Sequence, residues 1–249
     1  MPNELLLADL ALPSAVYGVH GAPGLTQWRS LASGTGLRGP YEAVEWACVP
    51  PGGLSGEHLH SRTEEVYVLL TGEGEALLNG RPQPVRAGEV ILTGLGATHG
   101  LRNTGPDALS WLTIEIPAPR TVRLAHSLRK DATPMPLPDG KATIINLQHE
   151  KDVDPRCVLQ GPLNRIRLLR LAPGQSEQLP SHGTEHTVFV LAGEATATAH
   201  SREVPIRKGM AVTTSGGESL CITAATEGFE AVCASFEILR RHHEGELAP

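Results

Sequence analysis

Four side chains in the first half of the chain have the types and spacing to bind a metal ion together. His58 and His60 stand two apart, so on an extended strand both imidazoles point to the same face. Glu65 opens the apolar run 65–70, and His99 follows a glycine-rich turn. Three imidazoles and one carboxylate converging inside a β-structure suit a divalent metal. The competing interpretation, unrelated surface polar residues, is disfavoured by the paired histidines and the surrounding glycines.

Such a site would leave part of the metal open to other molecules. Four protein ligands leave one or two positions on an ion that prefers five or six. Water, dioxygen or two substrate oxygens could enter there, with the metal acting as Lewis acid, template or redox centre. Glu65 is also a candidate catalytic residue, because a carboxylate can leave a metal and carry a proton. We predict one divalent transition metal per chain, with Fe, Mn, Ni, Cu and Zn all open.

Strand alternation places further side chains beside the predicted ligands. Tyr67 shares the face of Glu65, which makes it a second catalytic candidate, although a core tyrosine with a satisfied hydroxyl is the alternative. We expect a substrate pocket whose wall has few charges and accepts a small, largely apolar molecule. The residues expected to line it are Leu69, Leu101 and Asn103.

The elements that must position these residues are short strands. From residue 41 to residue 116, apolar segments alternate with turn signals, and Asn79-Gly80 is typical of a two-residue hairpin. The 27 glycines and 20 prolines also describe a turn-rich β protein. Evenly spaced short strands favour a closed or double-sheet antiparallel architecture. Residues 117–140, which are rich in proline, are expected to connect this unit to a second one.

The second half of the chain repeats the spacing of the first. The run 187–193 corresponds to 66–72, and both end in glycine. From Gly72 to Gly88 the chain advances as far as it does from Gly193 to Gly209. Matched spacing without close identity indicates a duplicated domain.

With these residues in view, the chain resembles the cupin family and is similar to a bicupin. The family motifs are G-x5-H-x-H-x3,4-E-x6-G and G-x5-P-x-G-x2-H-x3-N, and the first is matched from Gly52 to Gly72. The second is matched from Gly88 to Asn103, with Gly94 where the family usually has proline. The resemblance implies an all-β fold of two tandem jelly-roll barrels and the ligands His58, His60, Glu65 and His99. The other histidines, including His20, lie outside the motifs and are interpreted as solvated or local.

The domain boundaries follow from this resemblance. We predict a metal-binding cupin over residues 1–118, a linker over 119–140 and a degenerate cupin over 141–249. In the second copy Pro180 and Leu220 stand at the positions of the first and last histidine ligands. His182 and His186 remain as a degenerate second site, where a reduced metal site of His182, Glu185 and His186 is the alternative to a packing role.

Composition excludes several classes of partner. The net charge of −6 and a pI near 6 provide no basic field for nucleic acid. No apolar run approaches the ~20 residues of a membrane span, and the start lacks a signal peptide's basic region. Four cysteines without framework spacing indicate a reducing compartment. We therefore expect a cytoplasmic protein, monomer or homodimer, whose partner is a small molecule.

Three functions fit these observations. The first is a metal-dependent dioxygenase whose substrate chelates the metal, since bicupins with a degenerate second half resemble quercetin dioxygenases and pirins. The second is a non-redox isomerase, lyase, cyclase or amidohydrolase, and the third is a cupin that binds a small molecule without turnover. The fold alone does not choose among them, because cupins perform many reactions. We predict the dioxygenase.

Overall fold

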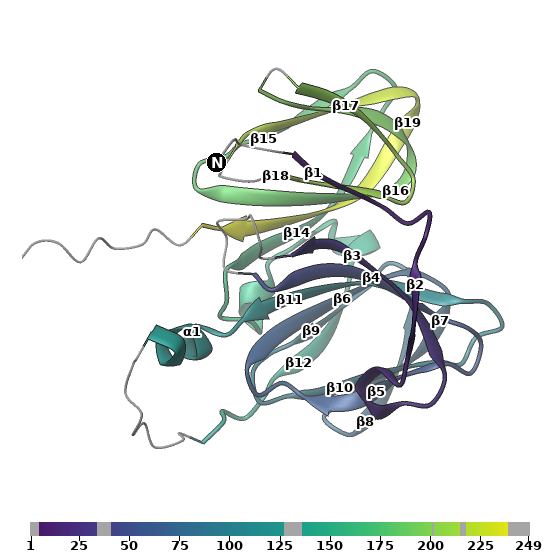
Figure 1. Ribbon diagram of the computed structural model, residues 1–249, viewed down its shortest axis with the longest axis vertical. Helices are drawn as coiled ribbons and strands as arrows, with labels where there is room; N and C mark the ends of the chain where they lie inside the picture. The colour runs from purple at the N-terminus through teal and green to yellow at the C-terminus, as the bar shows by residue number, and fades with distance from the viewer. Residues whose placement is uncertain (1–4, 34–40, 127–135, 201, 215–217, 239–249) are drawn as a thin grey trace, which may run out of the picture.

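A computed structural model describes residues 5–33, 41–126, 136–200, 202–214 and 218–238. The described chain is built almost entirely of antiparallel strands, which form two barrels stacked one above the other (Figure 1). The predicted all-β fold of two tandem barrels is confirmed.

The first barrel closes between a seven-stranded and a four-stranded sheet. The larger sheet has the order β12-β9-β6-β11-β4-β3-β2, and the smaller one has the order β5-β10-β7-β8. The strands are β2 (Ser14–Tyr17), β3 (Leu25–Ser33), β4 (Ala43–Val49), β5 (Leu54–Leu59), β6 (Thr63–Thr71), β7 (Glu73–Leu78), β8 (Arg81–Arg86), β9 (Glu89–Thr93), β10 (Thr98–Asn103), β11 (Leu109–Pro117) and β12 (Ala142–Asn146). The predicted Asn79-Gly80 turn joins β7 to β8, and both residues have positive φ.

The second barrel is one eight-stranded sheet whose two longest strands bend from one side of the barrel to the other. Its central path is β1-β18-β16-β19-β14-β13, with β15 paired to β19 and β17 paired to β16. The strands are β1 (Leu5–Asp9), β13 (Asp152–Val153), β14 (Leu163–Leu171), β15 (Ser176–Leu179), β16 (Thr184–Ala199), β17 (Arg202–Arg207), β18 (Met210–Thr214) and β19 (Leu220–Glu237).

The glycines that mark the sequence repeat occupy equivalent places in the two barrels. Gly72 and Gly193 have φ of 79° and 75°, a conformation that glycine adopts without strain. Gly88 donates its backbone N–H to the strand β6, and Gly209 donates to β16 in the same way. The repeat in spacing is therefore a repeat in structure.

Strand alternation divides the apolar side chains among three cores. In β6, Tyr67 and Leu69 face the interior of the first barrel, whereas Val66 and Val68 face the second barrel. The interior of the second barrel forms its own cluster around residues such as Val188. The two barrels thus share a buried apolar interface and pack as one body.

Each half also contributes a strand to the sheet of the other half. Strand β1 pairs with β18, where Leu5 lies opposite Thr214. Strand β12 pairs with β9, where Ile144 lies opposite Ile91. Division of the chain at residues 118 and 141 stays a prediction. Strands β1 and β12 each pair with a strand on the other side of the predicted linker.

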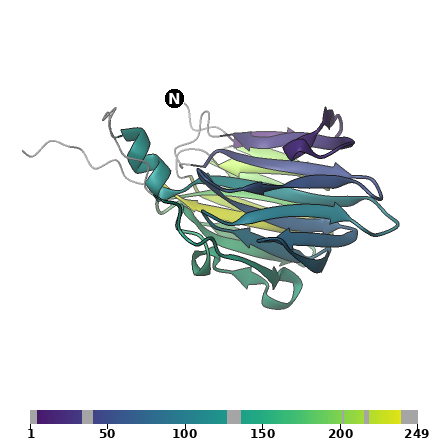
Figure 2. The same cartoon turned by 90° about the horizontal axis from the view of Figure 1, so that it is seen from below.

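Helices are few and short. The 3₁₀ turns are η1 (Val19–Gly21) and η2 (Pro155–Cys157), and the α-helices are α1 (Pro119–His126) and α2 (Leu147–Glu150). Helix α1 lies within the predicted linker and projects from one end of the stacked sheets (Figure 2). Within the described ranges, no helix has the length and apolar character that crossing a membrane would require.

Candidate metal centre

The two sheets of the first barrel bring the four predicted ligands together. His58 lies in β5 directly opposite His99 of β10, in the smaller sheet, and Glu65 faces them from β6 of the larger sheet. His60 follows β5, and its backbone N–H donates to Ala97 O at 2.9 Å. That bond ties the segment carrying two histidines to the turn that precedes the third.

The donor atoms converge on one carboxylate oxygen. Glu65 Oε2 lies 2.6 Å from His99 Nε2, 3.4 Å from His60 Nε2 and 3.8 Å from His58 Nε2. All four ligand atoms lie within 4.8 Å of one another. Within the described part of the chain, this is the only group of three or more such side chains that could hold an ion.

The buried polar atoms of this group fit a metal. His60 Nε2, His99 Nε2 and Glu65 Oε2 are buried and form no hydrogen bond of acceptable geometry, despite their short separations. Buried polar atoms without partners are costly and uncommon in folded proteins. A borderline divalent ion accepts this donor set and would satisfy all of these atoms at once.

Hydrogen bonds to the other ring nitrogens orient two of the imidazoles. His58 Nδ1 lies 3.0 Å from Gly56 O, and His99 Nδ1 lies 2.9 Å from Thr93 Oγ1. When Nδ1 carries the proton and donates it, Nε2 is left with a free lone pair, as a metal ligand requires. Neighbouring backbone and hydroxyl groups therefore favour the tautomer that binds metal.

Thr93 provides a test of this orientation. Replacing Thr93 by valine keeps the side-chain shape but removes the hydrogen-bond partner of His99, so metal affinity should fall about 10- to 100-fold. Competition with a chromogenic chelator measures this affinity. Thr214→Val, at the equivalent position in the second barrel, is the matched control and should leave metal affinity unchanged. Equal affinity in both variants would show that the Thr93 contact is incidental.

Burial and neighbouring charges shift the pKa values of the site. Burial would raise the pKa of Glu65, but its contacts with His60 and His99 outweigh that effect and hold the pKa below its usual range. Burial lowers the pKa of His58 to about 4. Burial also raises the pKa of Tyr67 well above its ordinary value, and the charge of Glu65 adds to the effect. These shifts favour an ionised Glu65 and a neutral His58 beside a protonated Tyr67.

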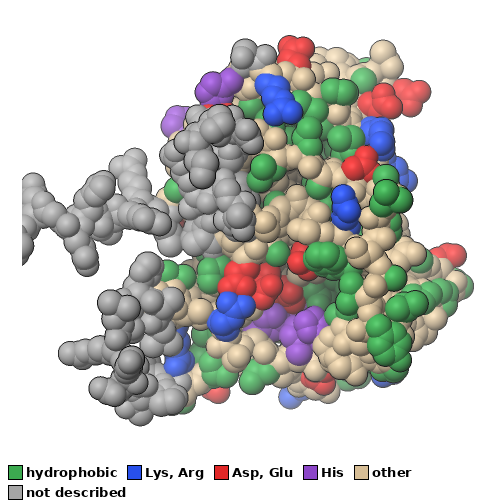
Figure 3. All heavy atoms as spheres, in the orientation of Figure 1, with side chains coloured by type: hydrophobic (Ala, Val, Ile, Leu, Met, Phe, Trp, Pro, Cys, Tyr) green, Lys and Arg blue, Asp and Glu red, His purple; other side chains and the backbone are tan. Residues whose placement is uncertain are grey.

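A cavity of about 260 Å³ opens from these residues to the surface. Figure 3 shows histidine and acidic side chains gathered around a hollow on this face of the first barrel. His58 lies nearest the opening, with 21% of its side chain exposed, whereas the other three ligands are buried. A volume this small suits a compact molecule.

Of the residues predicted to surround the substrate, only Tyr67 lines the cavity. Its ring lies 4.5 Å from that of His99. Leu69 and Leu101 pack in the barrel core and are not among the lining residues. Asn103 instead holds a turn, donating to Val49 O and Asp107 O. Contact of Leu69, Leu101 and Asn103 with a substrate stays a prediction, as does a catalytic role for Tyr67.

Several cavity residues were missed by the sequence analysis, among them His20, Glu45 and Glu115. His20, expected to be solvated or local, stacks on His58 with ring centroids 3.6 Å apart. Glu45 and Glu115 also line the cavity, so the expected wall with few charges was wrong. Burial raises the pKa of both carboxyls. The sequence did contain a signal for Glu45 and Glu115, because each is the single charged residue in an otherwise largely apolar strand.

In the second barrel, the remaining histidines do not form a comparable cluster among the described residues. His186 faces the barrel interior, where its Nδ1 lies 3.0 Å from Ser235 Oγ and its Nε2 lies 2.9 Å from Pro180 O. Both ring nitrogens therefore have protein partners. Leu220 is fully buried among apolar side chains, and His182 is exposed. These contacts support a packing role for His186, and the degenerate site stays a prediction.

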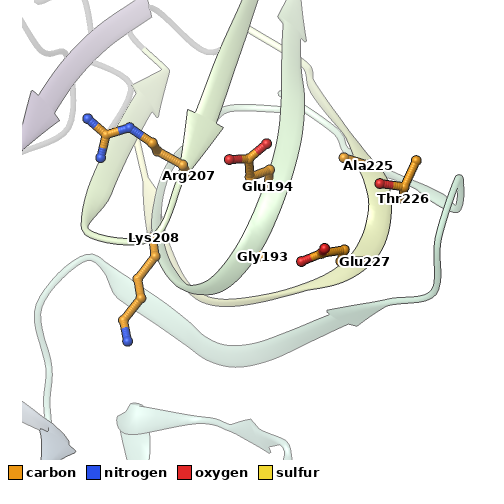
Figure 4. Close-up of a pocket in the computed structure, with 7 residues that line it drawn as sticks. All are labelled: Gly193, Glu194, Arg207, Lys208, Ala225, Thr226 and Glu227. Carbon is orange, nitrogen blue, oxygen red and sulfur yellow. The ribbon is translucent and has the colours of Figure 1, made fainter.

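A larger hollow of about 470 Å³ lies on the second barrel. Its polar residues are spread over strands and turns, and Figure 4 shows the side chains of Arg207 and Lys208 extending away from Glu194 and Glu227. We place the functional site in the smaller cavity, because the metal-ligating atoms converge there.

Comparison with known proteins agrees with this geometry. Residues 45–115 match the family described as the cupin domain. The chain is 31% identical over 104 residues to an oxalate-binding protein of Thermotoga maritima, covering 42% of this chain and 86% of that protein.

Solved structures that share the fold over nearly the whole chain include a pirin and a dioxygenase. One is the bacterial pirin YhhW of Escherichia coli in complex with nickel(II), with a TM-score of 0.67, 14% identity, and coverage of 94% of this chain and 99% of that one. The other is a salicylate 1,2-dioxygenase of Pseudoaminobacter salicylatoxidans with gentisate, with a TM-score of 0.61, 15% identity, and coverage of 95% and 83%. Together with the sequence match, the converging histidines and the barrel around them show that this chain belongs to the cupin family.

Proposed function

We propose that this protein binds one divalent transition metal through His58, His60, Glu65 and His99 and catalyses dioxygenation of a small molecule that chelates it. The observation that carries the proposal is the convergence of four donor atoms, three of them buried and without hydrogen bonds, at the base of a cavity. A site used only to hold the fold together would have no need of the opening beside it.

The names of similar proteins support a metal and a chelating small molecule. The Thermotoga protein is named for binding oxalate, which has oxygens placed to chelate a metal. The pirin structure contains nickel(II), and the dioxygenase structure contains gentisate, an aromatic acid whose ring hydroxyl lies beside its carboxylate. A substrate with two adjacent oxygens fits the open positions that four protein ligands would leave.

Residues around the cavity have distinct roles in this chemistry. A metal held there would polarise the substrate oxygens and, if redox active, would pass electrons toward dioxygen. Tyr67 stays protonated and can donate a hydrogen bond to a substrate oxygen. In this proposal Glu65 balances the positive charge, and its carboxylate would accept the proton of an enol or phenol. Burial of His60, Glu65 and His99 limits the access of water to the inner end of the cavity.

Oxygen consumption tests the proposal. The Fe(II)-, Mn-, Ni- and Zn-loaded proteins would be offered oxalate, catechols, salicylate and gentisate, in air and under argon. We expect oxygen uptake that matches substrate loss in one redox-active form and falls at least about 100-fold in Glu65→Ala. Glu73→Ala, an exposed carboxylate of the same barrel, is the control and should retain full turnover.

A non-redox reaction is the second candidate, because Glu45 and Glu115 place two further carboxyl groups in the cavity. Such groups can move protons in an isomerase, lyase or hydrolase without dioxygen. Equal turnover under argon, or with zinc, would establish that reaction class. Tight binding without turnover of any candidate would favour a binding protein.

The cellular setting remains part of the proposal. The four cysteines are unpaired, which supports a reducing compartment such as the cytoplasm. The partner is a small molecule, and both monomer and homodimer remain open.

A further inference from the structure

The wall of the cavity beside the metal ligands is acidic. Strand β11 lies between β6 and β4, and Glu115 lies directly opposite Glu65 of β6. In the next row, Thr113 lies between Tyr67 of β6 and Glu45 of β4. Side chains directly opposite on one face of a sheet approach within about 5 Å at their Cβ atoms. Glu45 and Glu115 therefore stand close to the place where a chelating molecule would sit.

Aromatic rings complete the same wall. Trp28, Tyr67 and Trp111 line the cavity together with the two carboxyls. The Trp28 indole N–H donates to Glu45 Oε2 at 2.8 Å, which holds ring and carboxyl in one arrangement. The faces of tryptophan and tyrosine attract organic cations, and the attraction strengthens where water is excluded. Carboxyls and rings placed together form a favourable environment for an ammonium group.

The charge of this wall is not neutralised by the cavity's own basic residue. Arg62 is the one Lys or Arg among the described lining residues, but it is exposed and forms a two-bond ion pair with Glu42. Ser55 Oγ supplies a further polar atom: it is fully buried at the cavity wall, near the Tyr67 hydroxyl, and forms no hydrogen bond of good geometry. Ser55 and Tyr67 thus place two hydroxyl groups at the cavity wall, where they can bond to a polar group of a ligand.

We propose that the substrate carries, besides two chelating oxygens, an ammonium or similar nitrogen-centred cation that binds Glu45 and Glu115. This inference rests on the proposed function, because the chelating oxygens fix which end of the molecule faces the metal. The cavity of about 260 Å³ limits that molecule to a single ring or a short chain. Anionic groups at the same end would meet two carboxyls and be rejected.

Three catechols that differ only in their side chain test the charge preference. The probes are dopamine, 4-methylcatechol and 3,4-dihydroxyphenylacetate, whose side chains are cationic, neutral and anionic. Titration calorimetry with zinc-loaded protein under argon prevents oxidation and measures binding without turnover. We expect dopamine to bind about 10-fold more tightly than 4-methylcatechol and the anionic probe to bind most weakly.

Charge-neutral variants assign the preference to residues. Glu45→Gln and Glu115→Gln should each reduce the ratio of the affinity for dopamine to the affinity for 4-methylcatechol. Glu73→Gln changes the net charge equally but lies outside the cavity, so it should preserve the order. Metal content, measured separately, shows that the chelating site is intact in every variant.

The possible results distinguish failure of this inference from failure of the proposed chelating function. Equal binding of the three probes, tightest binding of the anion, or an unchanged order in the Glu45→Gln, Glu115→Gln double variant would overturn the inference alone. Failure of all three probes to bind metal-loaded protein would overturn the chelating function, and the inference would fall with it.

Discussion

Replacing His99 by alanine is expected to remove the metal while leaving the protein folded. His99 Nε2 is buried and lies 2.6 Å from Glu65 Oε2, so its loss takes one donor from the centre of the cluster. We expect metal content to fall from about one ion per chain to a small fraction of that, because affinity should drop by more than the ~100-fold typical of supporting contacts. Elemental analysis after reconstitution and desalting measures the change.

His182→Ala is the matched control for that experiment. It removes a histidine from the second barrel and should leave one metal per chain, because the ring lies outside the converging group. The circular dichroism of both variants should match that of the parent protein, since apolar cores hold the barrels together. An unfolded His99→Ala chain would instead mean that the metal is structural. Two ions in the parent protein, with one lost in His182→Ala, would place a second metal site in the second barrel.

Replacing Phe236 by alanine is expected to destabilise both barrels together. Phe236 is fully buried in the interface between them, and its ring stacks on Tyr41 of the first half with centroids 4.3 Å apart. Truncating a buried phenylalanine costs about 3–5 kcal/mol, a large part of the ~5–15 kcal/mol that stabilises most domains. Tyr17→Ala removes an aromatic ring that is 74% exposed and should change stability by less than about 0.5 kcal/mol.

Urea denaturation followed by two signals tests the coupling. All three tryptophans, Trp28, Trp46 and Trp111, lie in the first half, whereas circular dichroism reports on the whole chain. Because the interface and the exchanged strands join the halves, we expect the two transitions to coincide and to shift together in Phe236→Ala. A tryptophan transition that stays in place while the circular dichroism shifts would show independent domains, as the predicted division at residues 118 and 141 implies.

The ligand set and the fold could be predicted because both are encoded by local spacing. The step of two residues from His58 to His60 along a strand decides that they share a face, and glycines at fixed steps decide where strands end. The repeat of those glycines revealed the second barrel. Such signals depend only on neighbours in the sequence, so one chain suffices to detect them.

The rest of the site depends on how distant strands pair. Glu45 and Glu115 enter the cavity because β4 and β11 lie side by side in one register, and a shift of either strand by one residue would turn its carboxylate outward. His20 reaches His58 through a 3₁₀ turn that packs closely on Gly56, where any larger residue would collide with the His20 carbonyl. Neither arrangement leaves a pattern in the local sequence.

The exchanged strands set a constraint on how this protein reaches its native state. Strand β1 leaves the ribosome long before its partner β18, which is synthesised near the end of the described chain. Strand β9 likewise waits for β12, so the metal-binding barrel keeps an unpaired edge until the chain has passed its midpoint. Contacts this distant in sequence slow folding and prolong exposure of strands prone to aggregate. The nascent first barrel should therefore depend on chaperones until β12 has been synthesised and can pair with β9.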